Sequence, residues 1–281
     1  MLLNQVKYVN SAGVELFLDD WERYLINTDE LRSFKWDYTL ANRSSGYGGR
    51  VARFTRPARE KSVRIGVRGR TEAEFADRIE YLHALTEIDI LTNTPGKLWL
   101  GNQYINCFLG VESNLNVWSK RGHFAEKDVK VLITEPFWCR EVSQAFTVSA
   151  GTTSTGGKRY TGRHPYRYGT TFSGGTLINP HYTSCPAIIT FAEAGDQPSV
   201  YIAEHGYTVN TTVGVGERVV IDQLNHTILH YTAAGVATNV FMYRDKTSDI
   251  FQYLPTGTLS VLYNADFSLV LIQQRSEPTW V

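Results

Sequence analysis

Helical periodicity is found at one place in the 281-residue chain, and this restricts the fold more than any other feature of the sequence. Thr71 and Glu74 have the S/T-x-x-E spacing of a capping box, in which two side chains satisfy free backbone N–H groups at a helix start. Over residues 72–91 one helix face is apolar, with side chains at Phe75, Ile79, Leu82 and Leu85. Pro95 and Gly96 then end the helix. Elsewhere the apolar residues form short runs, so the sequence predicts a mainly β protein.

The density of charged residues changes near Trp138. Residues 1–138 hold 19 Lys/Arg and 18 Asp/Glu, whereas residues 139–281 hold 9 and 10. Five of the six tryptophans lie in the first part, and ten of the sixteen tyrosines lie in the second. Because domains of roughly 100–150 residues are common, we expect two domains, residues 1–138 and residues 139–281.

The first part is expected to be an α+β domain in which antiparallel strands pack against the single helix. Gly101 and Asn102 tolerate positive φ, so they predict a hairpin between the runs Lys97–Leu100 and Tyr104–Leu109. Two further strands are predicted at Val111–Trp118 and Phe124–Ile133. Before the helix, a loop rich in glycine and serine indicates an extended hairpin arm between Lys35–Leu40 and Arg50–Phe54.

The second part has short runs of β-branched and aromatic residues at fairly even spacing, with turn residues between them. This pattern is typical of a β-sandwich or barrel. Strands are predicted at Ala187–Phe191, Tyr207–Val213, Arg218–Asp222, His226–Tyr231, Val236–Tyr243, Ile250–Leu254, Thr258–Tyr263 and Ser268–Gln273.

Composition and motifs argue against several functional classes. The net charge is zero and the pI is near 7.1, whereas a nucleic-acid-binding domain usually has a pI above about 9. No apolar run approaches the roughly 20 residues of a membrane span, and the N-terminus lacks the features of a signal peptide. Three sparse cysteines favour synthesis in a reducing cytoplasm, and we expect Cys107 and Cys139 to be buried. No motif points to catalysis, a metal or a cofactor, so we expect none.

Three local patterns approach known binding motifs. Residues 151–159, GTTSTGGKR, contain one glycine too many for a phosphate-binding loop and lack its hydroxyl residue, which favours a surface loop. Asp222, His226 and His230 share a strand face, but steps of four residues separate them by about 13 Å, too far for one metal ion. Residues 158–169 interleave tyrosines with basic residues, which suits sugars or single-stranded bases, or else an exposed loop between domains.

The segment from Arg43 to Arg70 is strongly basic, with nine Lys/Arg residues against one acid, Glu60. Three interpretations remain open for it. The segment contacts nucleic-acid phosphates, docks against an acidic protein surface, or is a solvated arm whose arginines point outward.

Several ordered segments resemble the distal tail protein family of long-tailed bacteriophages. In the first part these are residues 68–85 (RGRTEAEFADRIEYLHAL), 95–109 (PGKLWLGNQYINCFL) and 129–138 (VKVLITEPFW). In the second part, residues 216–229, 251–263 and 267–275 resemble the C-terminal galectin-like β-sandwich of that family. The resemblance spans most of the chain.

The resemblance implies a structural hub without enzymatic activity, located at the tail tip of the virion and made in the bacterial host cytoplasm. Members form a hexameric ring that joins the tail tube protein to the tail-tip or tail-associated protein, and they carry receptor-binding proteins outside. The N-terminal domains build the ring, whose channel lets DNA pass. The C-terminal domains project outward, and no membrane contact is implied.

The resemblance also assigns roles to residues of this chain. Structural motif positions are Gly69, Arg70, Gly96, Lys97, Leu98, Pro136, Phe137 and Trp138. The basic arm falls where the family has an extended hairpin for ring contacts, which suggests Arg43, Arg50, Arg53 and Arg56 as subunit or tube contacts.

Two other functional classes stay open. In a carbohydrate-binding accessory protein the C-terminal β-sandwich binds the sugar, although Asn179-Pro180 is followed by His181 and does not continue the galactoside-binding motif of galectins. In a hydrolase, carboxylates that are distant in the sequence meet in space.

Overall fold

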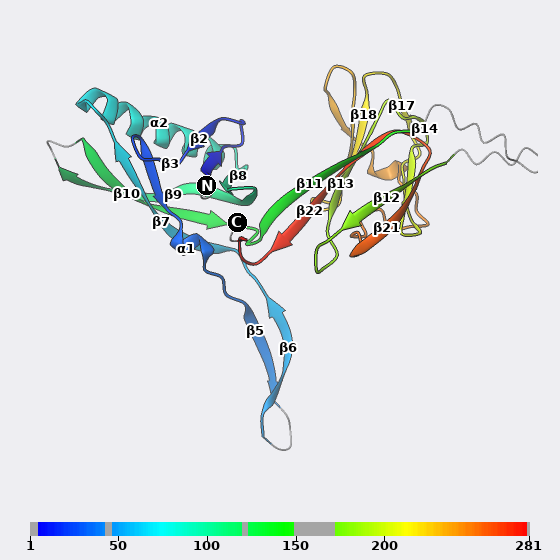
Figure 1. Cartoon of the computed structure of the whole chain (residues 1–281), viewed down its shortest axis with the longest axis horizontal. Helices are drawn as coiled ribbons and strands as arrows, with labels where there is room; N and C mark the ends of the chain where they lie inside the picture. Colours follow the sequence, from blue (N-terminus) through cyan, green and yellow to red (C-terminus); the bar gives the residue numbers. More distant parts are fainter. Residues whose placement is uncertain (1–4, 43–46, 120–122, 149–171, 280–281) are drawn as a thin grey trace, which may run out of the picture. The chain divides into compact units, whose positions relative to one another are not determined.

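The computed structural model describes residues 5–42, 47–119, 123–148 and 172–279. The chain divides into two compact units. Figure 1 colours the chain along the sequence and labels its helices and strands. The first unit comprises Met1–Arg140 and Gln274–Val281, and the second comprises Glu141–Gln273. The last eight residues, assigned above to the second domain, belong to the first unit, where the backbone N–H of Thr279 donates to Oε1 of Gln103 at 3.2 Å.

Antiparallel strands form the body of the first unit. Their order is β9-β10-β7-β4-β3, and β8 joins β9 to β1, which also pairs with β2. The elements are β1 (Val6–Val9), β2 (Glu15–Phe17), β3 (Asp19–Asp20), β4 (Tyr24–Asn27), α1 (Asp29–Arg32), β7 (Arg59–Arg68), α2 (Glu72–Leu91), β8 (Gly96–Leu100), β9 (Gln103–Ser119) and β10 (Phe124–Ile133). A separate ribbon consists of β5 (Asp37–Asn42) and β6 (Gly49–Thr55).

Helix α2 has the bounds that the sequence predicts. Thr71 is its N-cap, and its hydroxyl accepts the backbone N–H of Glu74. The Glu74 carboxylate accepts the N–H of Arg70 instead of that of Thr71, so the capping box is shifted by one residue on this side. Leu82 and Leu85 are buried against the sheet, while Phe75 and Ile79 are partly buried beside them. The predicted apolar stripe therefore forms the contact between helix and sheet.

Strand β9 is longer than the sequence predicts. The hairpin at Gly101 forms as expected, with φ of 62° at that glycine. Val111–Trp118, predicted as a separate strand, instead continues β9 through a bulge at Gly110, which has φ of 91°. A glycine at positive φ bends a strand without ending it, so the prediction of two strands was wrong.

The second unit is a β-sandwich with a shared apolar core. One sheet has the order β20-β19-β18-β13-β22-β11, and the other has the order β12-β21-β15-β16. The strands are β11 (Trp138–Phe146), β12 (Ser173–Asn179), β13 (Ala187–Ala192), β15 (Ser199–Ile202), β16 (His205–Thr208), β18 (Arg218–Asp222), β19 (Thr227–Tyr231), β20 (Ala237–Asn239), β21 (Gly257–Tyr263) and β22 (Phe267–Arg275), with a small pair β14 (Gly195–Asp196) and β17 (Thr212–Val213).

Some strand predictions for the second unit were wrong. Residues 250–254 form no strand, although Leu254 makes an isolated bridge to Cys185. The run Val236–Tyr243 divides into β20 and the short 3₁₀ helix η1 (Phe241–Tyr243), and Tyr207–Val213 is divided between β16 and β17. These runs contribute buried apolar side chains to the core of the second unit. A buried apolar run does not have to be a strand, so the apolar pattern alone did not give the correct structure.

Both cores lie between packed layers. In the first unit, Ile65 and Val67 of β7 and Leu109 of β9 are buried under α2. In the second unit, Phe146 stacks on Phe267 with ring centroids 4.6 Å apart. Among the described residues, no helix has the length and hydropathy of a membrane span.

Candidate assembly surface

The arm is the ribbon of β5 and β6, and it extends from the first unit (Figure 1). Its register pairs Tyr38 with Phe54 and Leu40 with Val51. Paired residues share a face of a ribbon and alternate residues return to it. All four apolar side chains therefore lie on one face, and their exposed fractions are 61%, 59%, 54% and 41% in the order named.

The opposite face of the arm carries the arginines. Thr39 pairs with Arg53 and Ala41 pairs with Arg50, and all four residues are exposed. A register shift between Thr39 and Leu40 makes Ala52 the extra residue of a bulge, which keeps the two faces distinct. The arm is therefore amphipathic although neither face is covered, and an isolated two-stranded ribbon is marginally stable in water.

An aromatic cage fixes the base of the arm. The Arg56 guanidinium lies 4.9 Å from the ring centre of Phe137, 5.6 Å from that of Trp36 and 5.9 Å from that of Phe34. Its Nη2 donates to the carbonyl of Ser276 at 3.0 Å. Arg56, suggested above as a contact for a partner, thus lies half-buried within its own unit.

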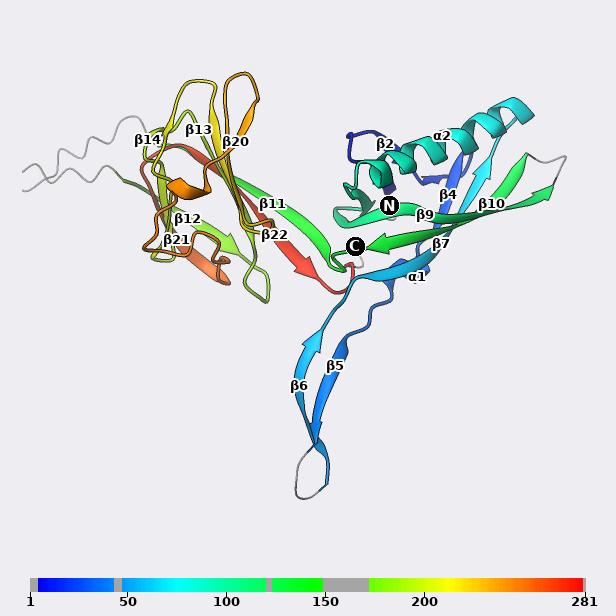
Figure 2. The same cartoon turned by 180° about the vertical axis from the view of Figure 1, so that it is seen from behind.

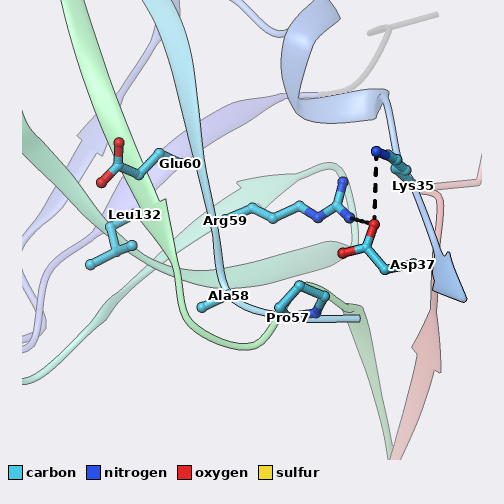
Figure 3. A pocket seen from close by; sticks show the side chains of 7 residues that line it. All are labelled: Lys35, Asp37, Pro57, Ala58, Arg59, Glu60 and Leu132. Carbon is cyan, nitrogen blue, oxygen red and sulfur yellow. Dashed lines mark hydrogen bonds and ion pairs between the residues drawn. The ribbon is translucent and has the colours of Figure 1, made fainter. Parts of the chain in front are cut away.

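A surface hollow of about 610 Å³ lies beside this base (Figure 3). Oδ1 of Asp37 accepts from Nη2 of Arg59 at 3.2 Å and lies 3.8 Å from Nζ of Lys35. Pro57 and Leu132 complete an open wall. The carboxylate joins the first residue of β5 to the first residue of β7, so it braces the arm against the sheet.

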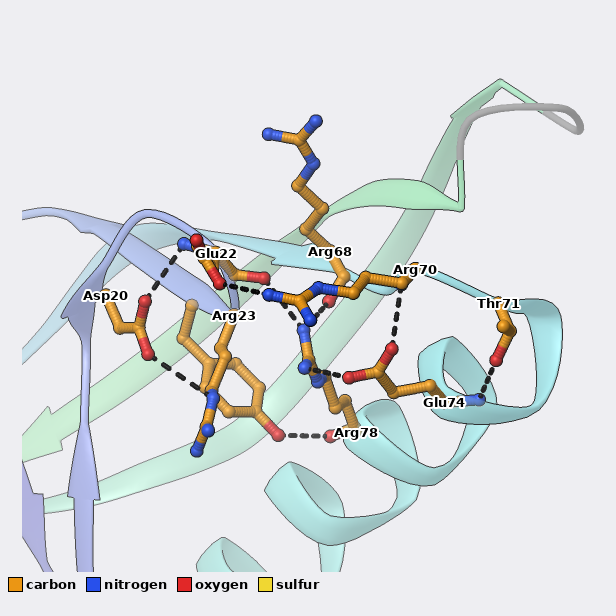
Figure 4. Close-up of polar contacts among 9 residues, drawn as sticks. Asp20, Glu22, Arg23, Arg68, Arg70, Thr71, Glu74 and Arg78 are labelled. Carbon is orange, nitrogen blue, oxygen red and sulfur yellow. Dashed lines mark hydrogen bonds and ion pairs between the residues drawn. The ribbon is translucent and has the colours of Figure 1, made fainter.

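The motif positions Gly69 and Arg70 connect β7 to helix α2. A β-carbon on Gly69 would lie 2.6 Å from the backbone nitrogen of Phe75, so only glycine fits. The Arg70 guanidinium donates to Glu22 at 2.7 Å, and its backbone N–H donates to Glu74 at 2.9 Å (Figure 4). These contacts give Arg70 a structural role.

The other motif positions also serve the fold. Leu98 is buried in the core, and the Lys97 ammonium lies 4.2 Å from the ring centre of Tyr104. Trp138 is buried, whereas Phe137 belongs to the cage at the base of the arm, and Pro136 immediately precedes it in the sequence. Gly96 packs against a buried pair formed by Tyr8 and Asp89.

The structure brings together some of the residues suggested from the sequence. Arg50 and Arg53 share one face of the arm, and Arg56 lies at its base, while Arg43 lies outside the described residues. Sequence reasoning missed the apolar face. In β5 the apolar face is indicated by Tyr38 and Leu40, which are two residues apart. In β6 the bulge at Ala52 places Val51 and Phe54 three residues apart, so the sequence of β6 does not show the alternation.

The histidines and cysteines singled out in the sequence lie in packed surroundings in the described part of the chain. No cluster of metal-binding side chains occurs among the described residues. His226 stacks on Phe251, and His230 lies 3.2 Å from Glu217. All three cysteines are buried, and burial raises the pKa of the Cys107 thiol to about 12. The phosphate-loop-like residues 151–159 and the tyrosine-rich residues 158–169 lie outside the described part.

Solved structures with the same fold include phage hub and baseplate proteins. The Dit protein (gp 19.1) of phage SPP1, titled a paradigm of the hub adsorption apparatus in phages that infect Gram-positive bacteria, aligns with a TM-score of 0.60 and 14% identity over 97% of this chain and 99% of that one. A chain of the phage P2 baseplate in its activated conformation with Ca aligns with a TM-score of 0.66 and 12% identity over 99% and 100%. A chain of the corresponding structure with Sr aligns with a TM-score of 0.63 and 13% identity, over 98% of this chain and 99% of that one.

Neither a scan against protein-family models nor a search of curated proteins finds a match to the sequence. The structural alignments cover both units and the arm, and they leave almost no part of either chain unmatched. Over nearly its whole length, this chain therefore has the fold of phage hub and baseplate proteins.

Proposed function

We propose that this chain is a structural hub of the tail tip of a long-tailed phage and acts by assembly without catalysis. Six copies form a ring that joins the tail tube protein to the tail-associated protein and leaves a channel for DNA. The first unit, Met1–Arg140 with Gln274–Val281, builds the ring. The galectin-like sandwich of the second unit, Glu141–Gln273, projects outward toward receptor-binding proteins.

The observation that carries this proposal is the uncovered amphipathic arm on a chain with the hub fold. The four large apolar side chains on one face of the arm are exposed in the single chain. Exposed apolar surface of this kind marks a protein contact. A protruding element that fits a different surface of the next copy makes a head-to-tail interface, and such interfaces close into rings.

Electron microscopy and mass measurement of the purified full chain test the ring. We expect ring-shaped particles with a central hole and a mass of six times 31.7 kDa. The paired substitution Tyr38→Ser and Phe54→Ser removes the aromatic pair of the arm and is expected to reduce the particles to single copies. Tyr201→Ser, in the second unit and also exposed, is the matched control and should leave the rings intact. A wild-type protein that is monomeric at every concentration contradicts the proposal.

Carbohydrate binding by the second unit is a second candidate. Strands β12, β21, β15 and β16 contain no Asp, Glu, Lys or Arg. On that sheet the exposed ring of Tyr201 lies 5.8 Å from the ring of Phe172, and an aromatic face beside hydroxyl groups suits a sugar. A glycan array probed with the full chain tests this candidate. If the wild-type chain binds a glycan and the Tyr201→Ala variant does not, the result supports carbohydrate binding. If the wild-type chain binds no glycan, the result contradicts it.

A further inference from the structure

Helix α2 carries a second apolar stripe on the side that faces solvent. The members of this outer stripe are Tyr81, Ala84, Ile88 and Leu91. Steps of three and four residues return to the same side of a helix, so the four side chains lie along one line. Tyr81, Ile88 and Leu91 are 46%, 39% and 78% exposed, and Ala84 is exposed as well. Both views show α2 along the edge of the first unit (Figures 1 and 2).

The fold of the first unit does not use this outer stripe. Leu82 and Leu85 already provide the contact between α2 and the sheet. A helix that packs on one side is normally polar on the other. The outer stripe instead repeats at the three- and four-residue steps by which helices pack against each other. From Tyr81 to Leu91 it extends about 15 Å, which matches about three turns of a second helix.

Acidic side chains border the outer stripe. Glu80 and Glu87 lie along one side of it, and Asp77 lies at its N-terminal end. All three residues are exposed. Arg78, the one Lys or Arg in the helix, already forms an ion pair with Glu74. The outer stripe is therefore apolar along its line and negative beside it.

The negative charge is not balanced within the C-terminal half of α2. Residues 79–96 contain no Lys or Arg, and the last turn of the helix has no basic side chain. Glu87 lies 3.6 Å from the ring of His83, which is charged only when it is protonated. The C-terminal end of a helix has a partial negative charge that nearby cations stabilise. Cations of a binding partner are therefore favoured beside the outer stripe.

Other parts of this chain fit the outer stripe poorly. A second copy of α2 brings carboxylates against carboxylates, which repel each other. In the arm, the apolar residues lie on the face opposite Arg50 and Arg53, so the arm cannot cover the stripe and meet the carboxylates together. On the sheet, Arg64 already lies 2.9 Å from Asp128 and 3.5 Å from Glu126. The charges therefore favour a different polypeptide as the partner.

We infer that the outer stripe binds an amphipathic helix of a different protein. The partner helix has apolar side chains at the same three- and four-residue steps, and these cover Ile88 and Leu91. Its lysines or arginines lie on the flank that faces Glu80 and Glu87. Opposite charges at this position set the direction and register of the partner helix. Such a contact adds a partner to the proposed hub and does not depend on ring formation.

A designed peptide tests the outer stripe in the full chain. The probe is a fluorescent synthetic helix of about 20 residues, with leucines at these steps and lysines on both flanks. Fluorescence anisotropy measures its dissociation constant. We expect Ile88→Gln to raise this constant about tenfold, whereas Ile90→Gln should leave it within about twofold. Ile90 is the matched control, because it is 41% exposed on the same helix but lies off the stripe.

A charge exchange tests the role of the carboxylates. A second probe has the same leucines, with glutamates in place of the lysines. We expect the wild-type chain to prefer the lysine probe at least about tenfold. The paired substitution Glu80→Lys and Glu87→Lys should reverse this preference, and a gain of binding cannot come from misfolding. Glu204→Lys with Glu277→Lys makes the same change of net charge at exposed positions outside α2 and should keep the wild-type preference.

The outcomes separate this contact from the proposed ring. A wild-type chain that binds neither probe, or binds both equally, overturns the outer stripe as a docking site. Equal weakening by Ile88→Gln and Ile90→Gln overturns it too, as does a charge exchange that does not reverse the preference. If Ile88→Gln abolishes self-association, the stripe is a contact between copies and a different partner is wrong. A chain that binds the lysine probe but never forms rings contradicts the proposed hub alone.

Discussion

At the scale of single residues, side chains are closely packed where Asp89 of α2 meets Tyr8 of β1 and Gly96 of β8. The Tyr8 hydroxyl donates to the buried Asp89 carboxylate, whose other oxygen accepts the backbone N–H of Ser11 at 2.6 Å. Burial and the neighbouring Cys107 and Asp89 raise the pKa of Tyr8 far above its ordinary value, so the phenol stays protonated as the donor. This pair satisfies a buried carboxylate, which is costly when unpaired.

Gly96→Ala tests this packing. The added β-carbon would lie 2.6 Å from Cζ of Tyr8 and 2.7 Å from Oδ2 of Asp89, so the buried pair must move. We expect a loss of about 1–3 kcal/mol in the free energy of unfolding, as for other overpacked cores. Gly174→Ala, whose new β-carbon would meet its nearest atom at 3.9 Å, should change that free energy little in the same denaturant titration.

Lys127 makes stability depend on pH. Burial lowers the pKa of its ammonium group in the folded chain, so the unfolded chain binds the proton more tightly. The free energy of unfolding therefore rises with pH between the folded pKa and the ordinary value of 10.5. Lys127→Met removes this penalty and should unfold at a higher denaturant concentration at pH 7. The difference from the wild type should shrink by pH 10, and an advantage that does not change with pH would contradict this explanation.

At the scale of elements, the base of the arm determines how the arm is presented. Phe137→Ala removes the ring closest to the Arg56 guanidinium, an interaction worth about 1–2 kcal/mol when shielded from water. We expect faster amide hydrogen exchange in β5 and β6. Tyr231→Ala removes a comparable contact with Arg218 in the second unit and should leave exchange in the arm unchanged.

Sequence patterns predicted those elements whose signals are local. Helix α2 has a cap at Thr71 and an apolar stripe, and strand β10 alternates cleanly, so both have the predicted bounds. At Gly110 the sequence does not distinguish a bulge from a turn, so it predicts two strands where the structure has the single strand β9. The cage around Arg56 was not predictable, because Trp36, Phe137 and Ser276 come from distant parts of the chain.

At the scale of the whole molecule, self-association should depend on salt. If the exposed arginines of the arm contact acidic side chains of another copy, raising the ionic strength from about 0.05 M to about 0.5 M screens the attraction and weakens assembly. Sedimentation at several salt concentrations measures the slope. The apolar part of the contact is not screened by salt. We therefore expect Arg53→Gln to make the dissociation constant for self-association less dependent on salt, while the dissociation constant at high salt changes little.

The second unit has its own core, including Phe191, Tyr207 and Val261. We therefore expect a fragment of residues 141–273 to fold alone and to unfold cooperatively on heating. A fragment without a cooperative transition would mean that the sandwich depends on the first unit.

The chain leaves the first unit once, in β11, and returns to it once, in β22. The second unit is therefore an insertion, held by two covalent tethers instead of one. A load applied to the sandwich is therefore shared between both backbone paths. A protease that cuts one tether nicks the polypeptide but leaves the second unit covalently attached through the other tether.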